Sequence, residues 1–152
     1  MKRNIVIAAI AIVAAIFAFR AYQQRSMRKD YEKFAEAIIR RHYDVAAAMT
    51  TGLTEDELRA AGTQEQTWGG PAMFQTLFPS RYRYESTKTE SDGSVTMQVT
   101  QEVRFNPVGV ESAVRPAMAA TMHQTATMRK VGGAWKIATF ENKFEKMDAI
   151  KY

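Results

Sequence analysis

The chain has 152 residues and a net charge of +5, a size that suits one ordinary domain. Its first thirty residues carry that whole charge, with six basic side chains against one acidic, so the remainder is neutral and lacks the basic surface typical of nucleic-acid binding. The absence of Cys and the presence of only two His exclude disulfides, thiolate catalysis, iron–sulfur clusters and a His-rich metal site. We therefore expect no cofactor, no metal and no nucleic-acid partner.

An apolar segment near the start of the chain predicts a membrane helix. Residues 5–19 are fifteen consecutive apolar side chains, preceded by two basic residues and followed by Arg20. At about 1.5 Å per residue they cover roughly 22 Å, less than the roughly 30 Å hydrocarbon core, so the flanking cations must reach out to the head groups. A cleaved signal peptide and a buried helix of a soluble protein are the alternatives. Residue pairs with cleavage-site spacing lie inside the apolar run rather than after it, which favours an uncleaved anchor over residues 5–22.

Basic residues follow the apolar run and form a collar, which consists of Arg20, Arg25, Arg28 and Lys29. Such a collar either faces anionic lipid head groups or sets the orientation of the helix. Counting the flanking charges alone would leave the following domain in the cytoplasm, whereas a short basic tail before an apolar run is typical of a signal anchor whose C-terminal part is exported. We favour export, which predicts a single-pass protein of the inner (cytoplasmic) membrane with its domain on the periplasmic side.

Helical periodicity follows the collar. Over residues 26–49 the apolar side chains recur at spacings of three and four, which places them on one helix face, and His42 falls in the same row. A second helix is predicted over residues 54–61, because Thr and Glu at its start have the spacing of a capping box. A break at residues 68–71 and a short third helix over residues 72–78 complete the helical part.

Alternating polar and apolar side chains predict antiparallel strands in the second half of the chain. Four strands are expected, over residues 81–91, 95–105, 117–131 and 134–144, with a bulge or strong curvature in the last. The fold class is therefore α+β, with an N-terminal transmembrane helix followed by helices packed on a curved four-stranded antiparallel sheet. The predicted organisation is a basic tail at 1–4, an anchor at 5–22, a basic juxtamembrane segment at 23–30 and a cone-like domain at 31–148.

The order of elements and the closing hairpin resemble the nuclear transport factor 2-like (cystatin-like cone) superfamily over about residues 27–146. The hairpin, residues 123–141, reads HQTATMRKVGGAWKIATFE, with a Gly turn before Trp135. An anchored form of this fold resembles the inner-membrane component of type IV secretion machines, and residues 38–44 are loosely similar to the first helix of that family. The resemblance implies that membrane and other subunits of a membrane complex are the partners, and self-association into a homo-oligomer is also open.

Few residues are candidates for chemistry. His42 is the catalytic candidate, because the superfamily resemblance implies a cone cavity in which some enzymes use a His or Asp to abstract a proton; a core His bonded to a backbone carbonyl is the alternative. Such a base would need a second polar group from the sheet, such as Tyr82, Tyr84 or Gln101. His123 is expected on the exposed face of its strand, and its spacing from His42 matches no metal-ligand pattern.

Three functions remain open. We favour a membrane-anchored, non-enzymatic assembly or accessory subunit whose α+β domain contacts other proteins. The alternative is a small-molecule binding protein or an isomerase/dehydratase-like enzyme with His42 in the cone cavity, and a third is a lipid or peptide carrier that uses Met residues to line the cone. A large exposed apolar patch would favour the first function, a pocket with polar groups the second, and an open apolar cavity the third.

Overall fold

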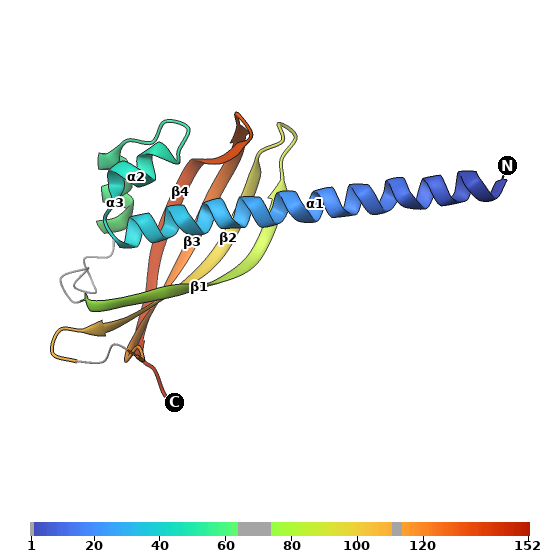
Figure 1. The fold of residues 1–152 in the computed structure, drawn as a ribbon. Helices are drawn as coiled ribbons and strands as arrows, with labels where there is room; N and C mark the ends of the chain where they lie inside the picture. The colour runs from blue at the N-terminus through green and yellow to red at the C-terminus, as the bar shows by residue number, and fades with distance from the viewer. Residues whose placement is uncertain (1, 64–73, 111–113) are drawn as a thin grey trace.

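A computed structural model describes residues 2–63, 74–110 and 114–152 (Figure 1). The elements in chain order are α1 (Lys2–Ile39), α2 (Tyr43–Ala48), α3 (Glu55–Thr63), β1 (Phe74–Thr89), β2 (Val95–Pro107), β3 (Met118–Val131) and β4 (Ala134–Ala149). The strands form one antiparallel sheet in the order β1-β2-β3-β4, so each strand pairs with the next one along the chain. This arrangement confirms the predicted α+β fold class.

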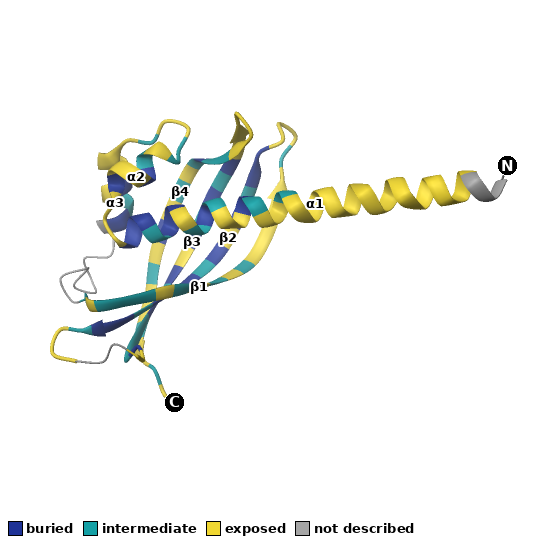
Figure 2. Ribbon diagram, in the orientation of Figure 1, coloured by how far each residue is buried: buried dark blue, intermediate teal, exposed yellow. Residues whose placement is uncertain are grey.

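The two halves of helix α1 have different surroundings. Its C-terminal half lies across the concave face of the curved sheet, and its N-terminal half projects away from the domain (Figure 1). The projecting half is exposed on every side (Figure 2), with Ile5 67% and Phe17 66% exposed. This is one helix near the N-terminus that is long and apolar enough to cross a membrane, with a mean hydropathy of 2.4 over its most apolar stretch.

Two apolar clusters hold the C-terminal half of α1 on the sheet. The first is centred on Phe34, which is fully buried and meets the ring of Phe140 edge to face at a centroid distance of 4.9 Å. The second lies around Ile39, Phe105 and Met122, toward the other end of the concave face. Burying each large side chain of this kind contributes about 1.5–3 kcal/mol, so both clusters fix α1 against the strands.

The long helix predicted over residues 26–49 is interrupted in the structure. α1 ends at Ile39, and Arg41 takes a positive φ of 58°. The N–H of His42 donates to the carbonyl of Ala37 at 2.9 Å and that of Arg41 donates to Ile38 at 3.0 Å, which is the bond pattern that ends a helix in the left-handed conformation. Periodicity did not reveal this turn because the apolar spacing continues through it into α2.

The short third helix predicted over residues 72–78 is wrong in its described part. Residues 74–78 begin β1, where Leu77 pairs with Phe105 of β2. The remaining two residues, and the predicted break at 68–71, lie outside the described residues. Other local predictions are confirmed: the Thr54 and Glu57 capping box forms, since the N–H of Glu57 donates to Thr54 Oγ1 at 3.2 Å and the N–H of Thr54 donates to Glu57 Oε2 at 2.8 Å. The β3–β4 pairing shifts register at two places, which confirms the predicted irregularity.

Candidate functional site

A row of polar side chains crosses the concave face of the sheet between the two apolar clusters. All four strands contribute to this polar row, which consists of Ser80, Tyr82, Gln101, Gln124 and Asn142. Strand register brings them together, because Tyr82 pairs with Gln101 and Gln124 pairs with Asn142. Gln101 is 0% exposed, and Gln124 and Asn142 are 2% exposed. Polar groups buried this deeply need hydrogen-bond partners.

One chain of hydrogen bonds passes through the row and ends at a carboxylate on α1, while a branch from the Gln124 amide donates to Asn142 Oδ1 at 3.2 Å. The hydroxyl of Tyr31, also on α1, donates to Gln124 Oε1, and the Gln124 amide donates to Gln101 Oε1 at 2.7 Å. The Gln101 amide donates to the hydroxyl oxygen of Tyr82 at 3.1 Å, and that hydroxyl donates to Glu36 Oε1 at 3.0 Å. Every donor in this chain points toward Glu36, so the chain stabilises the ionised carboxylate.

Glu36 keeps one oxygen fixed and the other free of donors. Its Oε1 accepts a second hydrogen bond from the backbone N–H of Ser80 at 3.0 Å. Its Oε2 is buried and has no hydrogen-bond donor among the described residues, although Arg40 Nε lies 3.7 Å away as its ion-pair partner. The hydroxyl of Ser80 accepts from the Gln101 amide at 3.0 Å and also forms a hydrogen bond with Tyr82. The site therefore contains a buried carboxylate oxygen that lacks a donor and, beside it, a serine hydroxyl that could turn from Tyr82 to a bound molecule.

The tyrosines of the site remain protonated and act as donors. Burial, reinforced by the neighbouring Glu36 carboxylate, raises the pKa of Tyr82 well above its ordinary value. Burial likewise raises the pKa of Tyr31, and for Tyr84 burial and a hydrogen bond to Glu32 raise the pKa. Since these phenols do not ionise near neutral pH, the proton acceptor of the site is Glu36.

A groove of about 600 Å³ between α1 and the edge strand β1 gives access to this carboxylate. Glu36, Ser80 and Tyr82 all line it. Its charged lining consists of three cations and two carboxylates, which are Lys29, Lys33, Arg40, Glu32 and Glu36. The excess of cations favours a ligand that carries negative charge.

His42 does not lie in the cone interior, contrary to the prediction. Because α1 ends at Ile39, His42 falls in the turn before α2, where its side chain is exposed. It lines the same groove as Glu36, but outside the polar row. Of the three groups predicted as its partners on the sheet, Tyr82 binds Glu36 and Gln101 binds Tyr82, whereas the Tyr84 hydroxyl donates to Glu32.

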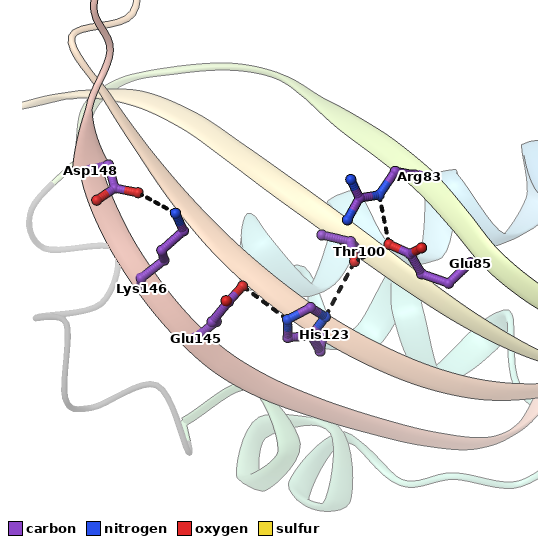
Figure 3. A network of polar contacts seen from close by, with 7 residues as sticks. All are labelled: Arg83, Glu85, Thr100, His123, Glu145, Lys146 and Asp148. Carbon is purple, nitrogen blue, oxygen red and sulfur yellow. Dashed lines mark hydrogen bonds and ion pairs between the residues drawn. The ribbon is translucent and has the colours of Figure 1, made fainter.

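His123 lies on the convex face of the sheet, as its strand position predicted (Figure 3). Its Nε2 is 2.9 Å from Glu145 Oε2 and its Nδ1 is 3.2 Å from Thr100 Oγ1, while the Thr100 hydroxyl donates to Glu85 at 2.9 Å. The side chain is 52% exposed, so solvent screens this network and it contributes little to stability. No group of three metal-ligating side chains occurs in the described parts of the chain.

The four residues of the basic collar have different surroundings. Arg20 lines a pocket where the projecting half of α1 meets the domain, and Arg25 is exposed on the helix. Arg28 places its guanidinium carbon 4.3 Å from the ring centroid of Tyr84, and Lys29 lines the α1–β1 groove. Arg28 thus contacts the domain, and contact of the collar with lipid stays a prediction.

Comparison with solved structures gives the fold of the domain. The 1.50 Å crystal structure of a "Putative Scytalone Dehydratase" from Novosphingobium aromaticivorans has a TM-score of 0.53 and 13% identity, covering 88% of this chain and 91% of that chain. A structure of a type 2 hexachlorocyclohexane dehydrochlorinase (LinA) has a TM-score of 0.47 and 9% identity, covering 87% and 91%. No family model and no curated protein matches the sequence. The likeness shows a nuclear transport factor 2-like fold, as the sequence predicted, and at this identity it shows the fold alone.

The expectation of a non-enzymatic assembly subunit needs correction. The similar structure with the higher TM-score is described as an enzyme rather than as a component of a secretion machine. Exposed large apolar side chains in the described domain are also scattered, with Val45 on α2, Val108 after β2 and Val131 at the end of β3. The enzyme alternative is therefore better supported, while the narrower resemblance to secretion components stays a prediction.

Glu36, Gln124 and Asn142 are absent from the candidates predicted from the sequence. A signal for Gln101 and Gln124 exists, because both occupy inward-facing positions of their strands between apolar neighbours. A polar residue at a buried position of an alternating strand must find a buried partner, and two such residues on adjacent strands indicate a network. Glu36 carries no comparable signal, since a Glu on the polar side of an amphipathic helix is common.

Proposed function

We propose that the protein is a small-molecule enzyme of the isomerase or dehydratase type, in which Glu36 accepts a proton from carbon. The observation that carries the proposal is the state of the Glu36 carboxylate in the α1–β1 groove. Its Oε1 is held by Tyr82 and Ser80, and its Oε2 has no hydrogen-bond donor among the described residues. A positioned carboxylate with one oxygen that lacks a hydrogen-bond donor is the kind of group that general base catalysis uses, and this buried oxygen must become exposed when a substrate binds.

The chemistry follows from the two groups that the site leaves available. Glu36 Oε2 takes the proton from the carbon next to a substrate carbonyl, and the electrons of that C–H bond form an enolate. The Ser80 hydroxyl donates a hydrogen bond to the enolate oxygen, where negative charge develops. Where the substrate carries a hydroxyl on the β-carbon, the enolate expels it, and it leaves as water with the proton returned from Glu36. Where the substrate instead carries a C=C double bond next to the deprotonated carbon, a dienolate forms, the proton returns to its far carbon and the product is an isomer with the double bond shifted.

The charges of the groove indicate the substrate class. Lys29, Lys33 and Arg40 line the groove, and Arg40 is 44% exposed beside the Glu36 carboxylate. A guanidinium in this position can bind a carboxylate or phosphate of the substrate next to the base. We therefore expect an enolisable organic acid. The dehydratase named for the similar structure carries out a reaction of the same broad class, which is a reason to test elimination beside isomerisation.

We further propose that residues 5–22 hold the enzyme in a bacterial inner membrane with its domain on the periplasmic side. The all-round exposure of this apolar helix supports a lipid environment, because a helix that packed on a partner protein would need only one apolar face. The short basic tail before it supports export of the domain. A reporter fused after Tyr152 tests the side: an exported phosphatase would be active there, and a cytoplasmic fluorescent reporter would contradict the assignment.

Hydrogen–deuterium exchange tests the proposed chemistry without knowledge of the natural substrate. The full-length protein is incubated in D2O with a panel of enolisable keto acids and their neutral methyl esters, and loss of the α-proton is followed by NMR. We expect exchange faster than in buffer, faster for the acids than for the esters, and at least about 100-fold slower in Glu36→Gln.

Glu32→Gln is the matched control. The Glu32 carboxylate also accepts a hydrogen bond from a tyrosine, Tyr84, at 2.9 Å, and Glu32 contacts the polar row only through its backbone carbonyl, which the substitution leaves in place. We expect this variant to exchange within about threefold of the unmodified protein, because the orientation of the Glu36 carboxylate does not depend on it. Equal exchange rates in Glu36→Gln and the unmodified protein, or no exchange of any panel member above the buffer rate, would contradict the proposed function.

A further inference from the structure

A second pocket lies where the projecting half of α1 meets the domain. It has a volume of about 530 Å³ and is lined by α1, by residues on both sides of the β1–β2 turn and by Trp135 of β4. Phe19, the last residue of the apolar run, and Arg20, the first cation after it, both line this pocket. If residues 5–22 span a membrane, as proposed above, the pocket opens at the level of the lipid head groups.

The lining of this pocket combines cationic, neutral polar and apolar groups and contains no acid. Arg20 supplies the cation, Gln24, Thr87 and Thr89 supply amide and hydroxyl donors, and Phe19 and Met27 supply apolar surface. The indole Nε1–H of Trp135 is buried and has no acceptor among the described residues. A phosphate group has oxygens for each of these donors, and an acyl chain can lie along the apolar side next to the membrane span.

The charges around the pocket reinforce this preference. Two acids of the hairpin are already paired, Asp92 with Arg129 at 3.1 Å and Glu90 with Lys88 at 3.0 Å. Asp30 accepts a hydrogen bond from the Trp135 backbone N–H at 3.4 Å. Lys130 lies close by, because its Nζ donates to the side chain of Gln23, a lining residue, at 2.8 Å. The neighbourhood therefore has cations in excess and acids that are engaged elsewhere.

From these observations we propose that the pocket binds the phosphate head group of one anionic phospholipid, with Arg20 as the principal contact. This site is separate from the α1–β1 groove and rests on the membrane anchor proposed above. Binding there would hold the domain at a fixed orientation on the membrane surface.

Native mass spectrometry of the full-length protein in nanodiscs tests the site. The nanodiscs contain phosphatidylcholine with a minority of phosphatidylglycerol, and the readout is the fraction of protein that retains one phosphatidylglycerol. We expect Arg20→Gln to lower the relative affinity for phosphatidylglycerol by about fivefold. Arg25→Gln is the matched control, because it removes the same charge from an exposed position of the same helix that does not line the pocket. Trp135→Phe, which keeps the ring and removes the N–H, is expected to lower retention as well.

Four results would overturn the proposal. An equal loss in Arg20→Gln and Arg25→Gln would show general attraction to an anionic surface, and full retention in both would show that Arg20 is not involved. Displacement of the lipid by soluble glycerol 3-phosphate at equal concentration would show a site for a soluble phosphate. Flotation with vesicles of phosphatidylcholine alone tests the anchor separately from the head-group site. We expect every variant to float with these vesicles. A protein that does not float would overturn both the anchor and the lipid site.

Discussion

The buried polar row makes a specific prediction about stability. Tyr31 is 0% exposed and its hydroxyl donates to Gln124 Oε1, so Tyr31→Phe removes this bond and leaves a buried acceptor without its donor. Leaving one buried polar group unsatisfied costs about 1–3 kcal/mol of unfolding free energy. Gln124→Leu removes three hydrogen bonds, those with the Tyr31 hydroxyl, Gln101 Oε1 and Asn142 Oδ1, and should cost at least about 2–6 kcal/mol.

The double variant separates this network from simple packing. With Tyr31→Phe already present, Gln124→Leu removes only the bonds to Gln101 and Asn142, so its cost should fall by about 1–3 kcal/mol. The assay is urea unfolding of the full-length protein in detergent micelles, followed by near-ultraviolet circular dichroism. Tyr84→Phe is the control, since Tyr84 is only half-buried and its partner Glu32 stays accessible to water. Additive costs of the two single changes, within about 0.5 kcal/mol, would refute a hydrogen-bonded row.

Three further predictions concern the apolar core, the Tyr82 hydroxyl and the convex face of the sheet. Phe34→Ala should lower the free energy of unfolding by about 3–5 kcal/mol in the same urea assay, because Phe34 is fully buried against Phe140. The free energy of unfolding should fall above about pH 10, because burial and Glu36 raise the pKa of Tyr82 in the folded protein. Below that pH the Tyr82 hydroxyl is protonated in both the folded and the unfolded chain. Above it the unfolded chain loses this proton first, which favours unfolding. Unfolding measured from about pH 8 to 11 should show a shallower decline in Tyr82→Phe. His123→Gln should leave the rate of keto-acid exchange unchanged, because His123 lies on the convex face of the sheet, away from Glu36. A loss of exchange in this variant would contradict a reaction site on the concave face.

The strands were the most predictable part of the fold. Inward positions of β2 and β3 alternate strictly, and Val99, Val103 and Met122 are all buried as their alternation predicted. This works because a strand of a sheet covered on one face repeats every two residues. The helices were less predictable at their ends, since the turn at Arg41 depends on backbone conformation and no Gly marks it.

The candidate site could be predicted only in part from the sequence pattern. The buried positions of Gln101 and Gln124 follow from strand alternation, but their pairing with Tyr31 depends on which turn of α1 lies over β3. That placement is a tertiary fact, set by the packing of Phe34 and Ile39 rather than by local propensity. Assigning the base to His42 followed from extending α1 beyond its true end, and the base proposed here, Glu36, lies within the helix.

One helix connects the membrane to both proposed sites, and its geometry constrains what each can bind. No Gly or Pro interrupts α1 between Arg20 and Ile39, so this part has none of the residues that usually kink a helix. At 1.5 Å per residue, Glu36 lies about 25 Å along the helix from Phe19, where the apolar run ends. An upright helix would hold the α1–β1 groove well outside the head groups, so its substrate arrives from water, in agreement with a charged rim that suits a soluble organic acid. The pocket at Arg20 is the one that lipid can reach, and because the same rigid helix carries Glu36, a lipid held there fixes the height and direction of the groove above the membrane.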